Sequence, residues 1–305
     1  GKIPYGGFAT TWMSADGNIA YCAEPSSPTP AAGSYSTSPV PSGDVTAAIW
    51  YSFGSPGFDA SMFPGSWYDG GGWDDAKYAA ASHVLIAYAY SGSESAATHG
   101  TSAEFASWAK SELIGGTYSR MKAGAGKVSA GFDAFCVRTG GGSQTLVSFS
   151  WSTGGVKVAK TDSEAGAEPQ GDASLDGASF SVVNETGRYV LVGGKYYADG
   201  EVCATIKTAP EDGSHVAATG TDALPAGSYR IEERHTGDDE HLLDPTPQYV
   251  ELKAGMGIVE RVFFNDKRPG IHLIKVDSAD LSKPVPNARF EIKAVDGSFG
   301  PEEFT

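Results

Sequence analysis

The sequence has 305 residues, 40 % of them hydrophobic, and its acidic residues exceed its basic ones by 37 − 22 = 15. This length leaves room for two domains or more, and the apolar content is too high for a disordered chain. The acidic surplus argues against nucleic acid or an anionic membrane surface as the partner. No apolar run is long enough to cross a membrane, so we expect no membrane insertion.

Residues 1–152, which we call the N-terminal segment, mix strand-like runs with helical ones. The runs predicted as strands lie between Gly, Pro and Ser residues and are Asn18–Ala23, Thr46–Phe53, Phe132–Arg138 and Thr145–Trp151. Helices are predicted at Asp74–Tyr90 and Ser102–Ile114, and Thr101 with Glu104 has the spacing of a capping box. We therefore predict a β-rich domain with inserted helices.

Residues 153–268, which we call the stalk segment, consist of short strand-like runs separated by turns, a pattern typical of an immunoglobulin-like β-sandwich. The predicted strands are Gly154–Asp162, Gly177–Asn184, Gly187–Val192, Glu201–Thr208, Gly227–Glu233, Gln248–Lys253 and Ile258–Asn265. The whole chain is thus predicted to be mainly β.

A repeat follows the stalk segment. The run Gly155–Asp162 recurs as Gly270–Asp277, so a second copy begins near residue 270. We therefore divide the chain into 1–152, 153–268 and 269–305. The last part is too short for a complete sandwich, and we expect it to be the truncated start of a second copy without a core of its own.

Three polar residues occupy unusual places in the stalk segment. Successive side chains of a strand point to opposite faces, so Lys160 shares a face with Val158, and Glu233 shares one with Ile231. Asn265 ends the last predicted strand. Burying a charge is costly unless the charge is paired or neutralised, so Lys160 and Glu233 need an explanation.

The order of these residues resembles the collagen-adhesin B-type (Cna B-type) pilin domains. The resemblance implies that Lys160 attacks the carboxamide of Asn265 and forms an isopeptide bond, with Glu233 as the catalyst. A desolvated lysine loses its proton easily, and a desolvated glutamate stays protonated and can polarise the amide. The alternative is an ordinary buried ion pair between Lys160 and Glu233. In the second copy Lys275 is present, but its glutamate and asparagine lie beyond Thr305.

The N-terminal segment has an aromatic–cysteine pair, Tyr21-Cys22, and a later run Ser143-Gln144-Thr145-Leu146-Val147. These motifs resemble the internal-thioester domains that precede pilin-like repeats on Gram-positive adhesins. The resemblance implies a thioester between Cys22 and Gln144, which a host amine, typically a lysine, opens to leave a covalent bond. The alternative for Cys22 is a plain buried cysteine.

One motif departs from that family. Where the family has Thr-Gln-x-x-apolar-Trp, this sequence has Ser82-His83 and, four residues after His83, Ala87. His83 is a candidate proton shuttle for amine attack, since imidazole titrates near neutral pH. The alternative is a helix histidine that is merely hydrogen-bonded. We expect Tyr21, Tyr88 and Tyr90 to shield the thioester from water.

The remaining candidates have simpler explanations. Cys136 is predicted to be a small core residue, and Cys203 is predicted to be partly exposed. The acidic run Asp238–Glu240 lacks the spacing of a calcium loop and is predicted to be a solvated turn. We expect no metal and no cofactor.

Three functions are compatible with these observations. The first is a monomeric adhesin, secreted and anchored to the cell wall, that bonds covalently to a host surface protein or another amine-bearing ligand and is not an enzyme. The second is a non-covalent binding module in which the aromatic loop Gly65–Trp73 holds a glycan or a peptide. The third is a cysteine enzyme with Cys22 as nucleophile and His83 as base.

Overall fold

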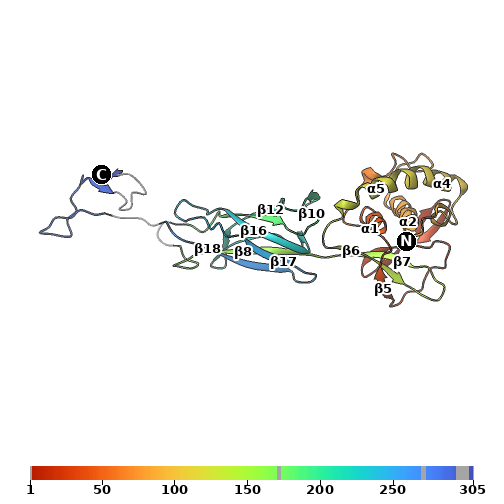
Figure 1. Cartoon of the computed structure of the whole chain (residues 1–305), viewed down its shortest axis with the longest axis horizontal. Coiled ribbons are helices and arrows are strands. Elements are labelled where there is room, and N and C mark those ends of the chain that lie inside the picture. The colour runs from red at the N-terminus through yellow and green to blue at the C-terminus, as the bar shows by residue number, and fades with distance from the viewer. Residues whose placement is uncertain (1, 170–172, 269–272, 293–301, 305) are drawn as a thin grey trace. The chain divides into compact units, whose positions relative to one another are not determined.

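The structure is a computed structural model that describes residues 2–169, 173–268, 273–292 and 302–304. The chain divides into two compact units, residues 1–266 and 267–305. Strands dominate and helices are gathered in the N-terminal segment (Figure 1), which confirms the predicted mainly β class.

The N-terminal segment is built on a five-stranded sheet with the order β3-β4-β7-β6-β5. Its strands are β3 (Met13–Ala15), β4 (Asn18–Cys22), β5 (Ser36–Pro39), β6 (Phe132–Arg138) and β7 (Leu146–Trp151). A separate hairpin consists of β1 (Lys2–Tyr5) and β2 (Phe8–Thr11). Within the large sheet, Tyr21 is paired with Val147 and Cys22 with Leu146. These two pairs face opposite sides of the sheet, because side chains alternate along a strand.

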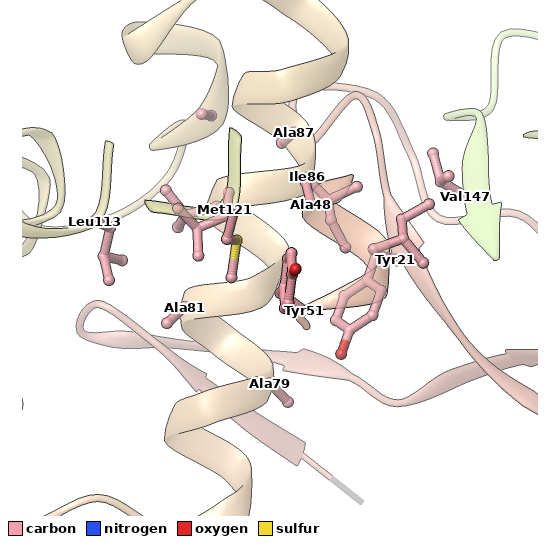
Figure 2. Close-up of a cluster of buried hydrophobic side chains, with 14 of the residues drawn as sticks. Tyr21, Ala48, Tyr51, Ala79, Ala81, Ile86, Ala87, Leu113, Met121 and Val147 are labelled. Carbon is pink, nitrogen blue, oxygen red and sulfur yellow. The ribbon is translucent and has the colours of Figure 1, made fainter. Parts of the chain in front are cut away.

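Helices cover the face of this sheet that carries Tyr21. They are α1 (Gly43–Trp50), η1 (Ala60–Met62), α2 (Asp75–Ser91), α3 (Glu94–Ala97), α4 (Ala103–Trp108), the π-helical η2 (Ala109–Tyr118), α5 (Ser119–Ala123) and η3 (Ala125–Lys127). Helix α2 begins at the cap Asp74, whose carboxylate accepts from the amide of Lys77, and ends at Gly92 with φ of 69°. Residues 79–87 of α2 are all buried. Figure 2 shows this core, with Tyr21 and Val147 beside α2 residues such as Ile86.

Two local predictions for the N-terminal segment were wrong. Residues 43–50 form the helix α1, although Thr46–Phe53 was predicted to be a strand. Val45, Ala48 and Ile49 of this helix are fully buried, and a short apolar run buried on all sides has no periodicity that separates helix from strand. The cap of α4 is Ser102 rather than Thr101, since Ser102 accepts from the amide of Phe105.

The stalk segment contains two facing sheets. One has the order β12-β9-β16-β17, and in the other β8 is central, with β14, β15 and the parallel strand β18 as partners. The strands are β8 (Thr153–Asp162), β9 (Ser179–Asn184), β10 (Val190–Val192), β11 (Lys195–Tyr197), β12 (Val202–Lys207), β13 (Ala209–Glu211), β14 (Ser214–Ala218), β15 (Leu224–Pro225), β16 (Gly227–His235), β17 (Gln248–Leu252) and β18 (Ile258–Asn265). All seven predicted strands are confirmed, and β11, β13, β14 and β15 were not predicted. The core between the sheets includes Val158, Phe180 and Ile231.

Cys203 is buried, with 4 % of its surface exposed, so the prediction of partial exposure was wrong. Strand β12 pairs with β9 through a register shift between Val202 and Ala204. Such a bulge interrupts the alternation of side chains on which the prediction depended.

The unit of residues 267–305 contains, in its described part, the hairpin of β19 (Phe290–Ile292) and β20 (Glu302–Phe304). The predicted strand Gly270–Asp277 lies partly outside the described residues. Its residues 273–275 are not in a strand, and Lys275 is exposed. In the stalk segment the matching run is held on both sides by β14 and β18, and strand structure needs such partners.

Candidate functional site

One pocket of the N-terminal segment contains the three residues that the sequence singled out. Its volume is about 340 Å³, and it is lined by Tyr5, Phe8, Thr10, Cys22, Pro25, Ser27, Thr29, His83, His99, Gly100 and Gln144. Cys22 comes from the end of β4, Gln144 from the residues just before β7, and His83 from the middle of α2. The pairing of β4 with β7 brings Cys22 and Gln144 to the same end of the sheet.

Hydrogen bonds to the backbone groups of Gln144 and Thr145 hold this part of the chain. The amide of Gln144 donates to the carbonyl of Pro28 at 3.0 Å, and its carbonyl accepts from the hydroxyl of Thr139 at 2.8 Å. The next amide, that of Thr145, donates to the carboxylate of Glu24 at 2.8 Å. The segment that follows Cys22 therefore holds Gln144 in place, and Glu24 is a positioning residue that the sequence analysis missed.

The electrostatics of the pair favour a neutral thiol beside a neutral carboxamide. Burial raises the pKa of Cys22 to about 12, although a hydrogen bond to Gln144 opposes that rise. Nε2 of Gln144 donates to Thr29 at 3.4 Å, whereas the buried Oε1 has no hydrogen-bond partner among the described residues. A buried polar atom without a partner is rare and costly, so a reaction at this carboxamide would break no hydrogen bond of Oε1.

His83 is buried beneath the same pocket. Only 3 % of its surface is exposed, its Nε2 has no hydrogen-bond partner in the part of the chain that the structure describes, and its ring lies 5.2 Å from that of Tyr5. Burial lowers the pKa of His83 from 6.5 to about 4. The ring is therefore neutral near pH 7, and it is not the hydrogen-bonded helix histidine that we considered as the alternative.

A second cluster lies in the core of the stalk segment and joins Lys160, Glu233 and Asn265. Nζ of Lys160 lies 3.3 Å from Oε1 of Glu233, and Nδ2 of Asn265 donates to Oε2 of the same carboxyl at 2.6 Å. All three side chains are at least 96 % buried. They meet because β18 runs parallel to β8 and pairs Phe263 with Lys160, while β16 lies in the facing sheet.

Burial and hydrogen bonds set the electrostatics of this cluster. Burial lowers the pKa of Lys160, and the charge of Glu233 opposes part of that shift. The backbone completes the cluster, since Lys160 also donates to the carbonyl of Thr236 and Nδ2 of Asn265 to that of Leu242 at 2.8 Å. Among the described residues, Oδ1 of Asn265 has no hydrogen-bond partner. The amine, the carboxyl and the carboxamide thus lie together in one buried site.

A family model described as a thioester domain matches residues 1–120. The N-terminal segment carries a thioester domain. The match includes Cys22 and His83 and ends before Gln144. No curated protein matches the sequence.

Solved structures give weaker likenesses. The TIE protein of Bacillus anthracis is 14 % identical over 95 % of this chain and 67 % of its own, with a TM-score of 0.28. The major pilin subunit of Bacillus cereus is 18 % identical over 45 % of this chain and 38 % of its own, with a TM-score of 0.28. The minor pilin of Streptococcus agalactiae is 16 % identical over 47 % of this chain and 63 % of its own, with a TM-score of 0.27.

The aromatic wall of the thioester-domain pocket differs from the one expected. Tyr5 and Phe8, from the hairpin of β1 and β2, line the pocket, and Phe8 is 63 % exposed. Tyr21 lies under the pocket with its ring edge-on to His83, whereas Tyr88 lines a different hollow. The position of this hairpin could not be predicted from the sequence, because the residues that it contacts, Ser102 and Phe105, are about a hundred residues away.

The aromatic loop Gly65–Trp73, considered as a glycan site, packs inward. Trp67 is buried, and Trp73 stacks on Tyr78 and donates to the carbonyl of Pro64 at 2.7 Å. The loop therefore stabilises the thioester domain and offers no open row of rings to a ligand.

Cys136 is fully buried, as predicted for a small core residue. Asp239 and Glu240 are exposed, but Asp238 is half-buried and bonded to His241, so the prediction of a solvated turn was wrong for Asp238. Among the residues that the structure describes, no helix is long and apolar enough to cross a membrane.

Proposed function

We propose that this chain is the binding end of a Gram-positive surface adhesin that bonds covalently to amines through a thioester between Cys22 and Gln144. The thiol of Cys22 attacks the Gln144 carboxamide, the C–N bond breaks, and ammonia leaves with the thiol proton. An incoming amine then attacks the thioester carbonyl, an amide forms, and the Cys22 thiol is released. The ligand is a lysine of a host surface protein or another amine-bearing molecule.

The observation that carries this proposal is the placement of Cys22 and Gln144, both buried, in the lining of one pocket of a thioester domain. A free thiol with a pKa raised to about 12 is a poor nucleophile for an external substrate. It can attack a carboxamide held against it, because fixed proximity supplies much of the rate. This favours an internal bond over the cysteine enzyme.

The pocket also suits the second step. A thioester must be protected from water until an amine arrives, and the buried positions of Cys22 and Gln144 provide that protection. His83 is neutral near pH 7 and its Nε2 is free of protein partners, so it can exchange a proton with the attacking amine. We expect His83→Ala to slow the reaction without abolishing it.

For the stalk segment we propose an isopeptide bond between Lys160 and Asn265. The neutral amine of Lys160 attacks Cγ of Asn265, Glu233 transfers a proton from the amine to Nδ2, and ammonia leaves. The support is the contact of one Glu233 carboxyl with both the nucleophile and the leaving group. A bond between the first and last strands would resist pulling forces on a surface-anchored protein. We propose that the chain acts outside the cell, as a monomer anchored to the wall through the rest of the protein.

Intact mass with peptide mapping tests both bonds. The purified chain should be lighter than its sequence by two ammonias, with Cys22 and Gln144 in one linked peptide pair and Lys160 and Asn265 in another. Methylamine should add its own mass at Gln144 and free the Cys22 thiol, and Cys22→Ala should show neither change.

Three outcomes separate the candidate functions. Loss of one ammonia from the stalk alone, with Gln144 unmodified, would favour a non-covalent binding module. A titratable Cys22 that turns over an added substrate would favour an enzyme. A mapped crosslink between other residues would overturn the assignment of the sites.

A further inference from the structure

A backbone segment, residues 236–244 between β16 and β17, touches all three members of the lysine cluster. We call it the cover loop. The carbonyl of Thr236 accepts from Lys160, and the carbonyl of Leu242 accepts from Nδ2 of Asn265 at 2.8 Å. The amide of Asp244 donates to Oε2 of Glu233 at 2.8 Å. The orientation of the Lys160, Asn265 and Glu233 side chains therefore depends on the backbone conformation of this loop.

A buried histidine fixes that path. His241 is fully buried, and its Nε2 lies 3.3 Å from Oδ2 of Asp162, on the strand that carries Lys160. Its Nδ1 lies 3.1 Å from Oδ1 of Asp238, within the cover loop itself. Asp162 is paired in register with Asn265 of β18. One imidazole thus connects the loop to the strands of both residues that would be crosslinked.

The two carboxylates that hold this ring are themselves fixed. Oδ1 of Asp162 accepts from the amides of Glu164 and Ala165, each at 2.8 Å. Asp238 accepts from the amide of Ser174 at 2.6 Å. Burial alone would raise the pKa of each carboxyl, but these amides and His241 lower both pKa values overall. The ring therefore lies between two carboxylates that backbone amides hold in place and whose pKa values are lowered.

Leu242, the residue after His241, binds the carboxamide of Asn265. Leu242 is held on both sides, since its amide donates to the carbonyl of Asp266 at 2.8 Å and its carbonyl receives Nδ2 of Asn265. The carbonyl of Leu242 and the carboxyl of Glu233 both accept from Nδ2, so together they fix the orientation of the Asn265 carboxamide. The leaving group is thereby kept beside the carboxyl that delivers its proton.

We infer that His241 is a positioning residue for the crosslink between Lys160 and Asn265, acting through the cover loop. The inference depends on the proposed isopeptide bond. Without His241, the cover loop loses its side-chain contact with Asp162 of β8, and a misplacement of about 1 Å can slow such a reaction by about a hundredfold.

The test measures the rate of ammonia loss in the full chain carrying Cys22→Ala, so that only the stalk crosslink contributes. Intact mass is followed over time during cell-free synthesis of this parent and of its variants. We expect His241→Ala to slow the loss by about tenfold or more. His241→Gln should recover part of the rate, because its amide can donate to one of the two carboxylates. Leu243→Ala, in the same loop with an exposed side chain, should match the parent.

The outcomes distinguish this inference from the crosslink itself. If the parent loses ammonia no faster than His241→Ala and His241→Gln do, the role of His241 is refuted. The isopeptide bond itself is then still supported. A parent that never loses ammonia overturns both. Should His241→Ala fail to fold, the folded His241→Gln chain gives the answer: a slower rate supports the role, and an unchanged rate refutes it.

Discussion

Nδ2 of Asn265 lies 2.6 Å from Oε2 of Glu233, in a site where neither side chain reaches solvent. The other oxygen of the same carboxyl contacts Nζ of Lys160. A single carboxyl therefore bridges the amine that would attack and the nitrogen that would leave, which is the relationship that a proton-transferring catalyst requires.

Removing that carboxyl should block the crosslink and weaken the stalk. In Glu233→Ala we expect the stalk to keep its ammonia, because the amine proton has no route to Nδ2. The variant also leaves Lys160 buried without its partner, which costs about 3–5 kcal/mol. Intact mass and thermal melting measure the two effects. Glu232→Ala is the matched control, since Glu232 lies on the opposite face of β16 and pairs with Arg230. Equal masses for Glu233→Ala and the wild type would contradict the assignment.

The contact of Glu24 with the Thr145 amide should matter for thioester formation. Glu24→Ala leaves a buried donor unsatisfied next to Gln144, at a cost of about 1–3 kcal/mol. We expect a larger fraction of free Cys22 thiol in the purified variant, measured by thiol titration under denaturing conditions. Glu104→Ala, an exposed acid in α4, should behave as the wild type. A fully formed thioester in Glu24→Ala would show that other contacts suffice to place Gln144.

The stability of the thioester domain should depend on pH through His83. The unfolded chain binds a proton on this ring below pH 6.5, whereas the folded chain binds it only below about 4. Between these values the unfolded state holds more protons, so stability rises with pH and is lost as pH falls from about 6.5 towards 4, by up to about 3 kcal/mol. Melting temperatures across this range measure the effect. His83→Gln should flatten the profile relative to His99→Ala, which removes an exposed ring. An identical slope in both variants would assign the pH dependence to other groups.

The hairpin that carries Tyr5 and Phe8 depends on a glycine. Gly6 has φ of 51°, and an added Cβ would lie 2.5 Å from the ring of Phe105. Gly17 has φ of 84° but no neighbour within 4 Å of an added Cβ. Gly6→Ala should therefore combine the backbone cost, about 1–2 kcal/mol, with an overpacking cost of about 1–3 kcal/mol, whereas Gly17→Ala should show the first alone. Thermal melting compares them, and the methylamine reaction should change more in Gly6→Ala. Equal losses of stability would mean that the hairpin shifts freely.

The faces of individual strands could be predicted well, because strand periodicity is a local property. Alternation placed Lys160 and Glu233 among apolar neighbours, and both are buried. The same reasoning failed at Cys203, where a bulge interrupts the alternation. It also failed at Thr46–Phe53, where burial on every side removes the periodic signal.

From the sequence alone, the candidate residues and the strands that hold them could be predicted, since both are expressed in residue types at short spacing. The surroundings of these residues are visible only in the folded structure. Tyr5 and Phe8 line the pocket of Cys22, Glu24 binds the amide of Thr145, and the cover loop contacts Lys160 through Thr236, all by contacts between residues far apart in the chain. Such contacts form because packing and hydrogen bonding select one path for each loop, and no local pattern in the sequence records that choice.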